Sequence, residues 1–251
     1  MPQNFRQTEI LGIARYEKKV IVEELAERLG VTVQTIRRDL SDLTGEGRLE
    51  RVHGGAILPS TVSNIGYQDR QSLNEAAKIE IAKRCAREIP DNSSLFMNIG
   101  TSTEAVAREL LKHENLTVIT NNMNVANILV ANESCDIKVA GGTLRRSDGA
   151  LIGDLTIQVF EQFKVDFAII GTSSMDNEGD LLDFDMQEVR VSKTIIKQSR
   201  KTYLVTDASK LKRNAPVRIA SLKEIDAVFI DKFPSDLRLK CEAWGTKVFE
   251  T

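Results

Sequence analysis

The segment LFMNIGTSTEAVARELL, residues 95–111, combines residue types that can bind an anion. An apolar run ends in small and hydroxylated residues, and a helical pattern begins at about Thr103. Backbone N–H groups at a helix N-terminus, together with hydroxyl groups, form a site for phosphate. We therefore predict that residues 100–103 bind a phosphate group. The alternative is that Thr101 or Ser102 only caps the helix.

Three further segments end apolar runs in polar or glycine-rich loops: TNN at 120–122, GGTLRR at 141–146 and DASKLKR at 207–213. Ligands of open α/β sheets bind at the carboxyl ends of strands, where such loops meet. Backbone donors, amides, Arg145 and Lys210 suit a small, polyhydroxylated anion such as a sugar or polyol phosphate. Asp185 and Glu188, at the start of the predicted helix 187–199, either hydrogen-bond the ligand or cap that helix. The predicted ligand-binding residues are Gly100, Thr101, Ser102, Thr103, Thr120, Asn121, Asn122, Gly141, Gly142, Arg145, Asp185, Glu188 and Lys210.

Alternating strand and helix patterns must position these loops. Strands joined through helices imply crossover connections, so we predict an α/β fold with a largely parallel sheet. The expected strands are 94–98, 116–120, 135–140, 165–171, 202–207 and 227–231, and the expected helices are 75–89, 103–112, 124–131, 155–163 and 187–199.

The N-terminal part of the chain predicts a helical unit. Residues 6–17 and 22–29 carry apolar side chains at the spacing of amphipathic helices, and Gly30 can end the second one. A third helical pattern, VTVQTIRRDLSDL, follows at residues 31–43. Two helices joined by a short turn form a helix-turn-helix.

The third helix divides into two faces. Ile36, Leu40 and Leu43 face inward, and Thr32 is the expected N-cap. Arginine contacts guanine, glutamine contacts adenine, and threonine or serine contacts a base or a phosphate, so the outer face suits a DNA major groove. The alternative is the solvated face of an ordinary helical bundle. The residues left outside are Gln34, Thr35, Arg37, Arg38 and Ser41.

The next segment, GRLERVHGGAILP, predicts the wing of a winged helix. Two short strands flank His53-Gly54-Gly55, and the two glycines supply the positive φ angles of a tight hairpin. His53 then lies at the wing tip, where it contacts phosphate. The predicted DNA-binding residues are Thr32, Gln34, Thr35, Arg37, Arg38, Ser41 and His53.

Composition limits the class of protein. Residues 1–58 contain nine Lys or Arg and nine Asp or Glu, and the whole chain has a net charge of -2, so attraction to DNA must come from local placement. Three separated cysteines and two histidines predict no zinc cluster and no disulfide framework. We expect no membrane span, no cofactor and a cytoplasmic protein, because the chain lacks an apolar signal core and long apolar runs.

The chain resembles the DeoR family of bacterial transcriptional regulators. VTVQTIRRDLSDL and RVHGGA resemble the family's helix-turn-helix and wing, and NIGTST, TNN, AGGTLRR, FAIIGTSSMDNEG and DASK resemble its effector domain in order and spacing. The resemblance implies a DNA-binding domain at 1–58, a linker at 59–74 and a sugar-phosphate-sensing domain at 75–251. The sensing domain is expected to be similar in fold to ribose-5-phosphate isomerase.

Other segments resemble the branch of the family that responds to glycerol 3-phosphate: GTSTEAVA, TNNMNVAN, RRSDGALIG, GDLLDFDMQEVR and KLKRNAPV. The resemblance implies a repressor whose operator affinity is controlled by this or another sugar phosphate. Two positions depart from the family pattern, because Asn98 replaces a frequent Asp and Ser192 a frequent Lys. A regulator with one winged helix is expected to form a dimer or tetramer on duplicated half-sites.

Two alternatives remain open. A sugar-phosphate isomerase with an added helical unit could use Asp183, Asp185 or Glu188 as a base. However, residues 171–174 are Gly-Thr-Ser-Ser where the isomerases carry Gly-Ala-Asp-Glu, so hydroxyl groups replace their carboxylates. A purely structural oligomer would leave the exposed arginines and Lys210 without a role. We therefore predict a regulator and not an enzyme.

Overall fold

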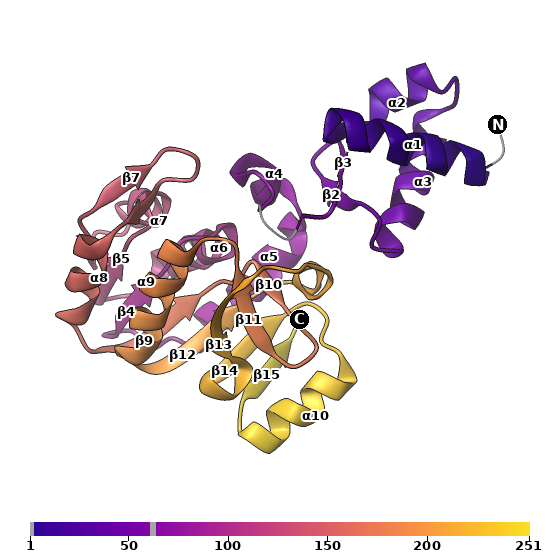
Figure 1. Ribbon diagram of the computed structural model, residues 1–251. Helices are drawn as coiled ribbons and strands as arrows, with labels where there is room; N and C mark the ends of the chain where they lie inside the picture. Colours follow the sequence, from indigo (N-terminus) through magenta and orange to yellow (C-terminus); the bar gives the residue numbers. More distant parts are fainter. Residues whose placement is uncertain (1–2, 61–63) are drawn as a thin grey trace. The chain divides into compact units, whose positions relative to one another are not determined.

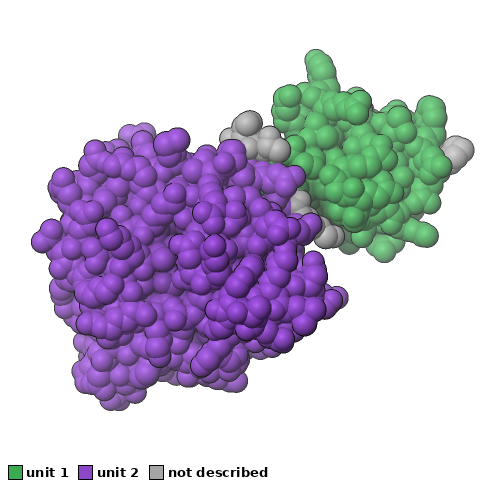
Figure 2. All heavy atoms as spheres, turned by 60° about the horizontal axis from the view of Figure 1, so that its bottom comes forward, with its two compact units in different colours: residues 1–73 green, residues 74–251 purple. Residues whose placement is uncertain are grey.

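The computed structural model describes residues 3–60 and 64–251. The chain divides into two compact units, Met1–Leu73 and Asn74–Thr251, which are coloured separately in Figure 2. The unit boundary lies at the end of the predicted linker, and residues 61–63 of that linker lie outside the described residues.

The first unit is a winged helix-turn-helix, as predicted. Gly30 has a φ of +61°, the left-handed conformation expected after a helix end. The fold also contains β1 and α4, which the sequence patterns did not predict. The elements are α1 (Gln3–Glu17), β1 (Lys19–Ile21), α2 (Val22–Arg28), α3 (Val33–Gly45), β2 (Glu50–Val52), β3 (Gly55–Ile57) and α4 (Tyr67–Ser72).

The core of this unit forms where α1, α2 and α3 bring their apolar faces together. The predicted inward residues Ile36, Leu40 and Leu43 are all fully buried in it. A buried ion pair joins α1 to α3, because Arg6 donates to the Asp39 carboxylate through both Nε and Nη2, the latter at 3.0 Å from Oδ1. Removing one partner of a buried pair leaves an uncompensated charge, so this contact fixes the angle of α3 on α1.

The wing is a three-stranded antiparallel sheet in the order β1-β3-β2. The prediction that both wing glycines supply positive φ angles is only half correct. Gly54 has a φ of +70°, but Gly55 lies in the central strand. A Cβ atom on Gly55 would lie 1.9 Å from the Val20 carbonyl oxygen. Gly55 is therefore required by the close approach of β1 and not by the turn.

The second unit has the predicted α/β fold. Its elements are α5 (Glu75–Ala86), β4 (Ser94–Met97), α6 (Thr101–Glu109), η1 (Leu110–Lys112), β5 (Leu116–Thr120), α7 (Met123–Leu129), β6 (Cys135–Val139), β7 (Thr143–Arg145), β8 (Ala150–Ile152), α8 (Asp154–Glu161), β9 (Val165–Ile170), β10 (Ser174–Met175), β11 (Asp180–Asp183), α9 (Met186–Lys197), β12 (Ser199–Val205), η2 (Ala208–Lys212), β13 (Val217–Ser221), η3 (Leu222–Glu224), β14 (Ala227–Ile230), α10 (Ser235–Trp244) and β15 (Lys247–Glu250).

Seven strands form one parallel sheet in the order β15-β14-β12-β9-β4-β5-β6. The chain builds outward from β4 through β5 to β6, and then from β9 through β12 and β14 to β15. The strand order therefore reverses between β4 and β9. In open parallel sheets, the crevice at such a switch point is where ligands bind.

Helices cover both faces of this sheet (Figure 1). One apolar core lies between the sheet and α5, α6 and α7, and a second lies between the sheet and α8, α9 and α10. Two small antiparallel sheets, β7-β8 and β10-β11-β13, add to the second layer. The sequence patterns missed these short strands and β15, since two to five residues give little periodicity, and they also missed the ten-residue helix α10.

Candidate DNA-binding face and effector site

The outward face of α3 presents side chains that the fold does not use. Gln34, Arg37, Arg38 and Ser41 are exposed and Thr35 is half-buried. Within the described residues, neither Arg37 nor Arg38 forms an ion pair with its own unit. Guanidinium groups left in this way are available to an external anion or base edge.

Thr32 is the N-cap of α3, as predicted. Its Oγ1 accepts from the backbone N–H of Thr35 at 3.2 Å, and the two hydroxyl oxygens lie 2.9 Å apart. These contacts order the first turn of the helix, so Thr32 has a structural role whether or not it also contacts DNA.

The wing tip lies next to α3 in the chain and carries one exposed candidate, His53, in the turn between β2 and β3. Arg51, on β2, was not predicted as a binding residue. Burial and the positive charge of Arg37 lower the pKa of Arg51, and its Nη1 has no hydrogen-bond partner within the described part of the chain. A phosphate bound between the guanidinium groups of Arg37 and Arg51 would be stabilised by both charges and would reduce their mutual repulsion.

In the second unit, the four predicted loops follow β4, β5, β6 and β12 of the parallel sheet. All seven strands are parallel, so the carboxyl ends of these four lie at the same edge of the sheet. That the loops surround one ligand pocket stays a prediction. Asn98 closes the switch point itself. Its Oδ1 accepts from the Gly171 N–H at 3.1 Å, after β9, and its Nδ2 donates to Ser192 Oγ on α9 at 3.3 Å.

The two residues that depart from the family pattern are therefore bonded to each other. Asn98 and Ser192 are each 4% exposed. This neutral amide–hydroxyl contact joins the loop after β4 to α9.

The loop after β4 leads directly into α6, which begins at Thr101 and not at about Thr103 as the sequence suggested. Its N-cap is Gly100, with a φ of +145°, and a glycine has no side chain with which to cap the helix. The first-turn N–H groups of a helix can bind an anion, so phosphate binding by residues 100–103 stays a prediction.

Thr103 has a different role from the one predicted. It is fully buried, and its hydroxyl donates to the carbonyl oxygens of Asn98 at 2.9 Å and Gly100 at 2.7 Å. A hydroxyl has a single proton, so Thr103 shapes the loop and has no proton left to donate to a ligand.

At the end of β5, three predicted residues differ in how far their side chains are already hydrogen-bonded within the protein. Thr120 donates to the Met97 carbonyl oxygen at 2.7 Å, and Asn122 caps α7 by accepting from Asn124 and Val125 N–H groups. Asn121 donates to the Leu151 carbonyl oxygen at 3.0 Å, but its buried Oδ1 has no partner among the described residues. Of the three, Asn121 retains an acceptor for a ligand hydroxyl.

Gly141 and Gly142 are needed for packing. A Cβ on Gly142 would lie 2.3 Å from Thr156 Oγ1 and 2.6 Å from the Ile152 carbonyl oxygen. Thr156, at the start of α8, donates to the Gly141 carbonyl oxygen at 2.7 Å. The two glycines therefore allow the β7-β8 hairpin to approach α8.

Arg145, at the end of β7, is surrounded by carboxylates. It contacts Asp148 through Nη2 at 2.6 Å, Asp185 through Nη1 at 2.6 Å, and Glu188 through Nη2. Asp185 also caps α9 by accepting from the Gln187 N–H at 2.8 Å. Arg145 was predicted to bind either the hydroxyls or the phosphate of the ligand, and one cation among three acids favours the hydroxyls. We call Arg145, Asp148, Asp185 and Glu188 the acidic cluster.

Glu188 is the most perturbed group of the acidic cluster. Burial and the charge of Asp183 raise the pKa of Glu188 to about 8, although Arg145 opposes the shift. A carboxyl group that is neutral near pH 7 can donate to as well as accept from a hydroxyl group, which suits a polyol.

Lys210, in η2, is buried beside Asp207, which lies two positions after the end of β12 and is 1% exposed. Burial raises the pKa of Asp207, but Lys210 and hydrogen bonds from Ser209 and Asn74 lower it, so the net pKa lies below the usual value. Lys78 of α5 acts on Asp207 in the same direction and is also buried. Two cations therefore lie close enough to this buried carboxylate to lower its pKa.

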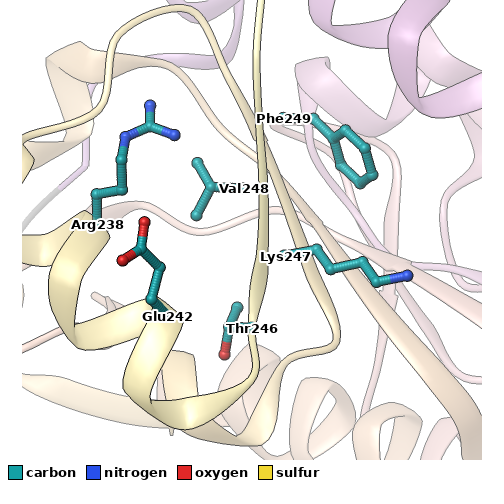
Figure 3. A pocket seen from close by; sticks show the side chains of 6 residues that line it. All are labelled: Arg238, Glu242, Thr246, Lys247, Val248 and Phe249. Carbon is teal, nitrogen blue, oxygen red and sulfur yellow. The ribbon is translucent and has the colours of Figure 1, made fainter.

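A shallow hollow of about 330 Å³ lies elsewhere, between α10 and β15 at one end of the sheet (Figure 3). Its lining residues are Arg238, Glu242, Thr246, Lys247, Val248 and Phe249. None belongs to the predicted ligand set, and Arg238 pairs with Glu250. Within residues 3–60 and 64–251, no cluster of three His, Cys, Asp or Glu could hold a metal ion, and no helix could span a membrane.

Sequence patterns missed several of the residues that matter here. Asp39 and Arg6 are buried ionic residues in amphipathic helices, and nothing in the periodicity marks them as partners. Lys78 stands among other charged residues of α5, and a buried lysine has no distinct pattern. Asn74 was assigned to the linker, although an asparagine directly before a helix is a recognisable N-cap signal.

Two protein-family models match the chain. The DeoR-like helix-turn-helix domain matches residues 6–62, and the DeoR C terminal sensor domain matches residues 73–232.

Similar proteins cover nearly the whole chain. The glycerol-3-phosphate regulon repressor of Escherichia coli strain K12 is 45% identical over 93% of this chain and 93% of its own length. The repressor of the same name from Haemophilus influenzae is 44% identical over 94% of this chain and 92% of its own. The structure of ribose 5-phosphate isomerase A from Methanocaldococcus jannaschii is 15% identical, covers 55% of each chain and has a TM-score of 0.41.

Proposed function

Because the chain belongs to the DeoR family, we propose that it is a DNA-binding transcriptional repressor whose operator affinity falls when glycerol 3-phosphate binds. The observation that carries the proposal is the presence, in one chain, of an outward Gln-Thr-Arg-Arg face on α3 and a helix start with a glycine N-cap at a sheet switch point. The relatives named as glycerol-3-phosphate regulon repressors support the choice of effector.

In the DNA-binding half, α3 enters the major groove and the wing contacts the backbone. Arg37, with Gln34 and Thr35, lies nearer the bases, and Arg38 lies nearer the phosphates. Arg51 adds a phosphate contact between α3 and the wing, because a phosphate relieves its repulsion from Arg37. His53 contacts the backbone from the wing tip.

In the effector half, the phosphate and the hydroxyl groups of the ligand bind at different ends of one site. The first turn of α6 and Lys210 hold the phosphate, because both carry positive charge toward the carboxyl edge. Asn121 and Glu188 bind the glycerol hydroxyls, since each has an acceptor suited to them. The acidic cluster repels the phosphate and so sets its orientation.

The same proposal assigns the three parts of the chain. Residues 1–58 bind DNA, residues 59–74 connect, and residues 75–251 sense the effector and carry the assembly surface. A dimer or tetramer doubles the operator contacts of one winged helix. Sedimentation at micromolar concentration should reveal an oligomer, and a purely monomeric protein would contradict this assignment.

The second candidate, a sugar-phosphate isomerase, is favoured only by the raised pKa of Glu188. The loop after β9 is against it. Thr172 donates to the Ser174 and Leu182 carbonyl oxygens, and Ser174 donates to that of Arg213, so these hydroxyls serve the fold. Incubation with ribose 5-phosphate and related sugar phosphates should give no turnover above background.

An operator gel shift tests the proposed function. The purified protein should retard operator DNA, and glycerol 3-phosphate should release it, whereas glycerol and inorganic phosphate at the same concentration should not. Release by a different sugar phosphate alone would reassign the effector, and failure to bind any promoter of a glycerol-catabolism gene would reject the repressor assignment.

A further inference from the structure

Asn74 is the first residue of the second unit, and its side chain is bonded in an unusual way. It follows Leu73, which ends α4, and it is the N-cap of α5. An N-cap asparagine ordinarily accepts from first-turn N–H groups, but Asn74 does not cap α5. Its Nδ2 instead donates to Oδ1 of Asp207 at 2.8 Å, across 133 positions of sequence.

The backbone of Asn74 is also specialised. Its φ of +54° lies in the left-handed region, which asparagine and glycine adopt more readily than other residues. Its carbonyl oxygen accepts from the Lys78 N–H at 3.0 Å, which begins α5. At this one residue, the segment that enters α5 therefore combines a left-handed backbone conformation with a long-range hydrogen bond.

Asp207 is the other end of this bond, and it lies in the charged part of the effector site. The carboxylate is 1% exposed and accepts from Ser209 N–H at 3.1 Å and from Ser209 Oγ. The backbone N–H of Lys210 donates to its carbonyl oxygen at 3.0 Å. The side chains of Lys210 and Lys78 supply the positive charge that keeps the buried carboxylate ionised.

An anion bound at Lys210 must change this balance. The phosphate and the Asp207 carboxylate are like charges that share the same lysine, and buried like charges repel because little water screens them. Asp207 can respond by moving, by taking up a proton or by reorienting, and each response alters the acceptor to which Asn74 is bonded. A change at Asp207 caused by the effector would therefore alter the hydrogen bond of Asn74, the residue at which the chain enters the second unit.

We propose that the Asn74–Asp207 hydrogen bond transmits effector binding to the DNA-binding unit. Asn74 binds neither the effector nor DNA and acts only on the coupling between the two sites. This inference rests on the proposed function, since it needs an effector that lowers operator affinity.

The test is the variant Asn74→Gly in the full-length protein. Glycine keeps the left-handed backbone available and removes only the amide group, so the fold is preserved. Operator affinity is measured by fluorescence anisotropy with and without saturating glycerol 3-phosphate, and effector affinity is measured by calorimetry. The ratio of the two operator dissociation constants is the coupling factor.

The matched control is Asn92→Gly. Asn92 is also an exposed, left-handed asparagine of the second unit, with a φ of +61°, and its side chain bonds Asn115 far from Lys210 in sequence. In Asn74→Gly, both affinities measured separately should match the parent, and the coupling factor should fall at least about fivefold, the smallest allosteric coupling ordinarily seen. Asn92→Gly should keep the coupling factor of the parent.

Several other outcomes would contradict this inference. Parent-like coupling in Asn74→Gly, loss of coupling in both variants, or weaker effector binding in Asn74→Gly alone would each overturn the inference. If the parent itself binds no operator or shows no response to glycerol 3-phosphate, the proposed function fails first, and the inference fails with it.

Discussion

On α3, Arg37 and Arg38 point away from their own unit and, among the described residues, form no ion pair. At the carboxyl edge of the large sheet, Arg145 is enclosed by three carboxylates. Arginine therefore occurs on α3 with an exposed guanidinium group, and beside the large sheet with a guanidinium group that is already paired with carboxylates. An exposed arginine is free to serve a partner, whereas a partly buried arginine must first compensate the charges around it.

The difference extends to the neutral residues of the two regions. Thr103, Thr120 and Asn122 are buried at the effector site, and their side chains close loops or cap helices. Gln34 and Ser41 are exposed on α3. The DNA-binding face can therefore change sequence with little effect on folding, whereas the effector site combines binding with stability. Four predictions can break or sharpen this contrast.

The largest effect is expected for Arg145→Ala. Removing the cation leaves Asp148, Asp185 and Glu188 facing one another, so unfolding free energy should fall by about 3 kcal/mol, near the lower end for a broken buried pair because Arg145 is partly exposed. Chemical denaturation measures this loss. Its exposed neighbour provides the control, since Arg146→Ala should leave stability unchanged. Equal stability of both variants would show that the acidic cluster does not depend on Arg145.

A second effect concerns the bridge between the loop after β4 and α9. Asn98→Asp and Ser192→Lys each place one unpaired charge in a buried site, and each should cost about 2 kcal/mol of stability. The double variant restores a pair of opposite charges, so its cost should be at least about 1 kcal/mol below the sum. Strictly additive losses in a double-mutant cycle would mean that the two positions do not compensate each other.

On the DNA-binding face, Arg37→Ala should act on binding alone. Loss of a base-contacting arginine weakens operator binding by about 1–3 kcal/mol and relaxes specificity at one base pair. The melting temperature should not change, because the side chain is exposed. Arg15→Ala, an exposed arginine on α1, is the control of equal charge. A lower melting temperature with parent-like operator binding would remove Arg37 from the DNA-binding face.

The smallest expected effect is a pH dependence from Glu188. Its pKa of about 8 lies above that of a glutamate in an unfolded chain, so between these values the folded protein binds more protons than the unfolded one. Stability from this group is present at low pH and is lost as the pH rises toward 8. Denaturation at pH 5, 7 and 9 should therefore show the parent losing stability relative to Glu188→Gln as pH rises. A relative gain would contradict the assigned direction.

The sequence predicts the regions in this contrast unequally, for physical reasons. Periodicity identifies α3 and its outward residues because Ile36, Leu40 and Leu43 must be buried, which determines the opposite face. The parallel sheet and its loops follow from alternating long apolar runs. Nothing comparable predicts that Arg145 contacts Asp185 and Glu188, forty or more positions away, since such pairs depend on tertiary packing. The role of Gly55 likewise depends on β1, a strand too short to be recognised from its sequence.

The most direct test of the account is the reciprocity of binding at its two sites. Glycerol 3-phosphate affinity is measured by calorimetry for the free protein and for the operator-bound protein, and operator affinity is measured with and without the effector. Linkage requires both ratios to be the same factor, which we expect to lie between about 5 and 150. The account predicts weaker effector binding to the operator complex by this factor. Equal effector affinity for the free and operator-bound protein would contradict it.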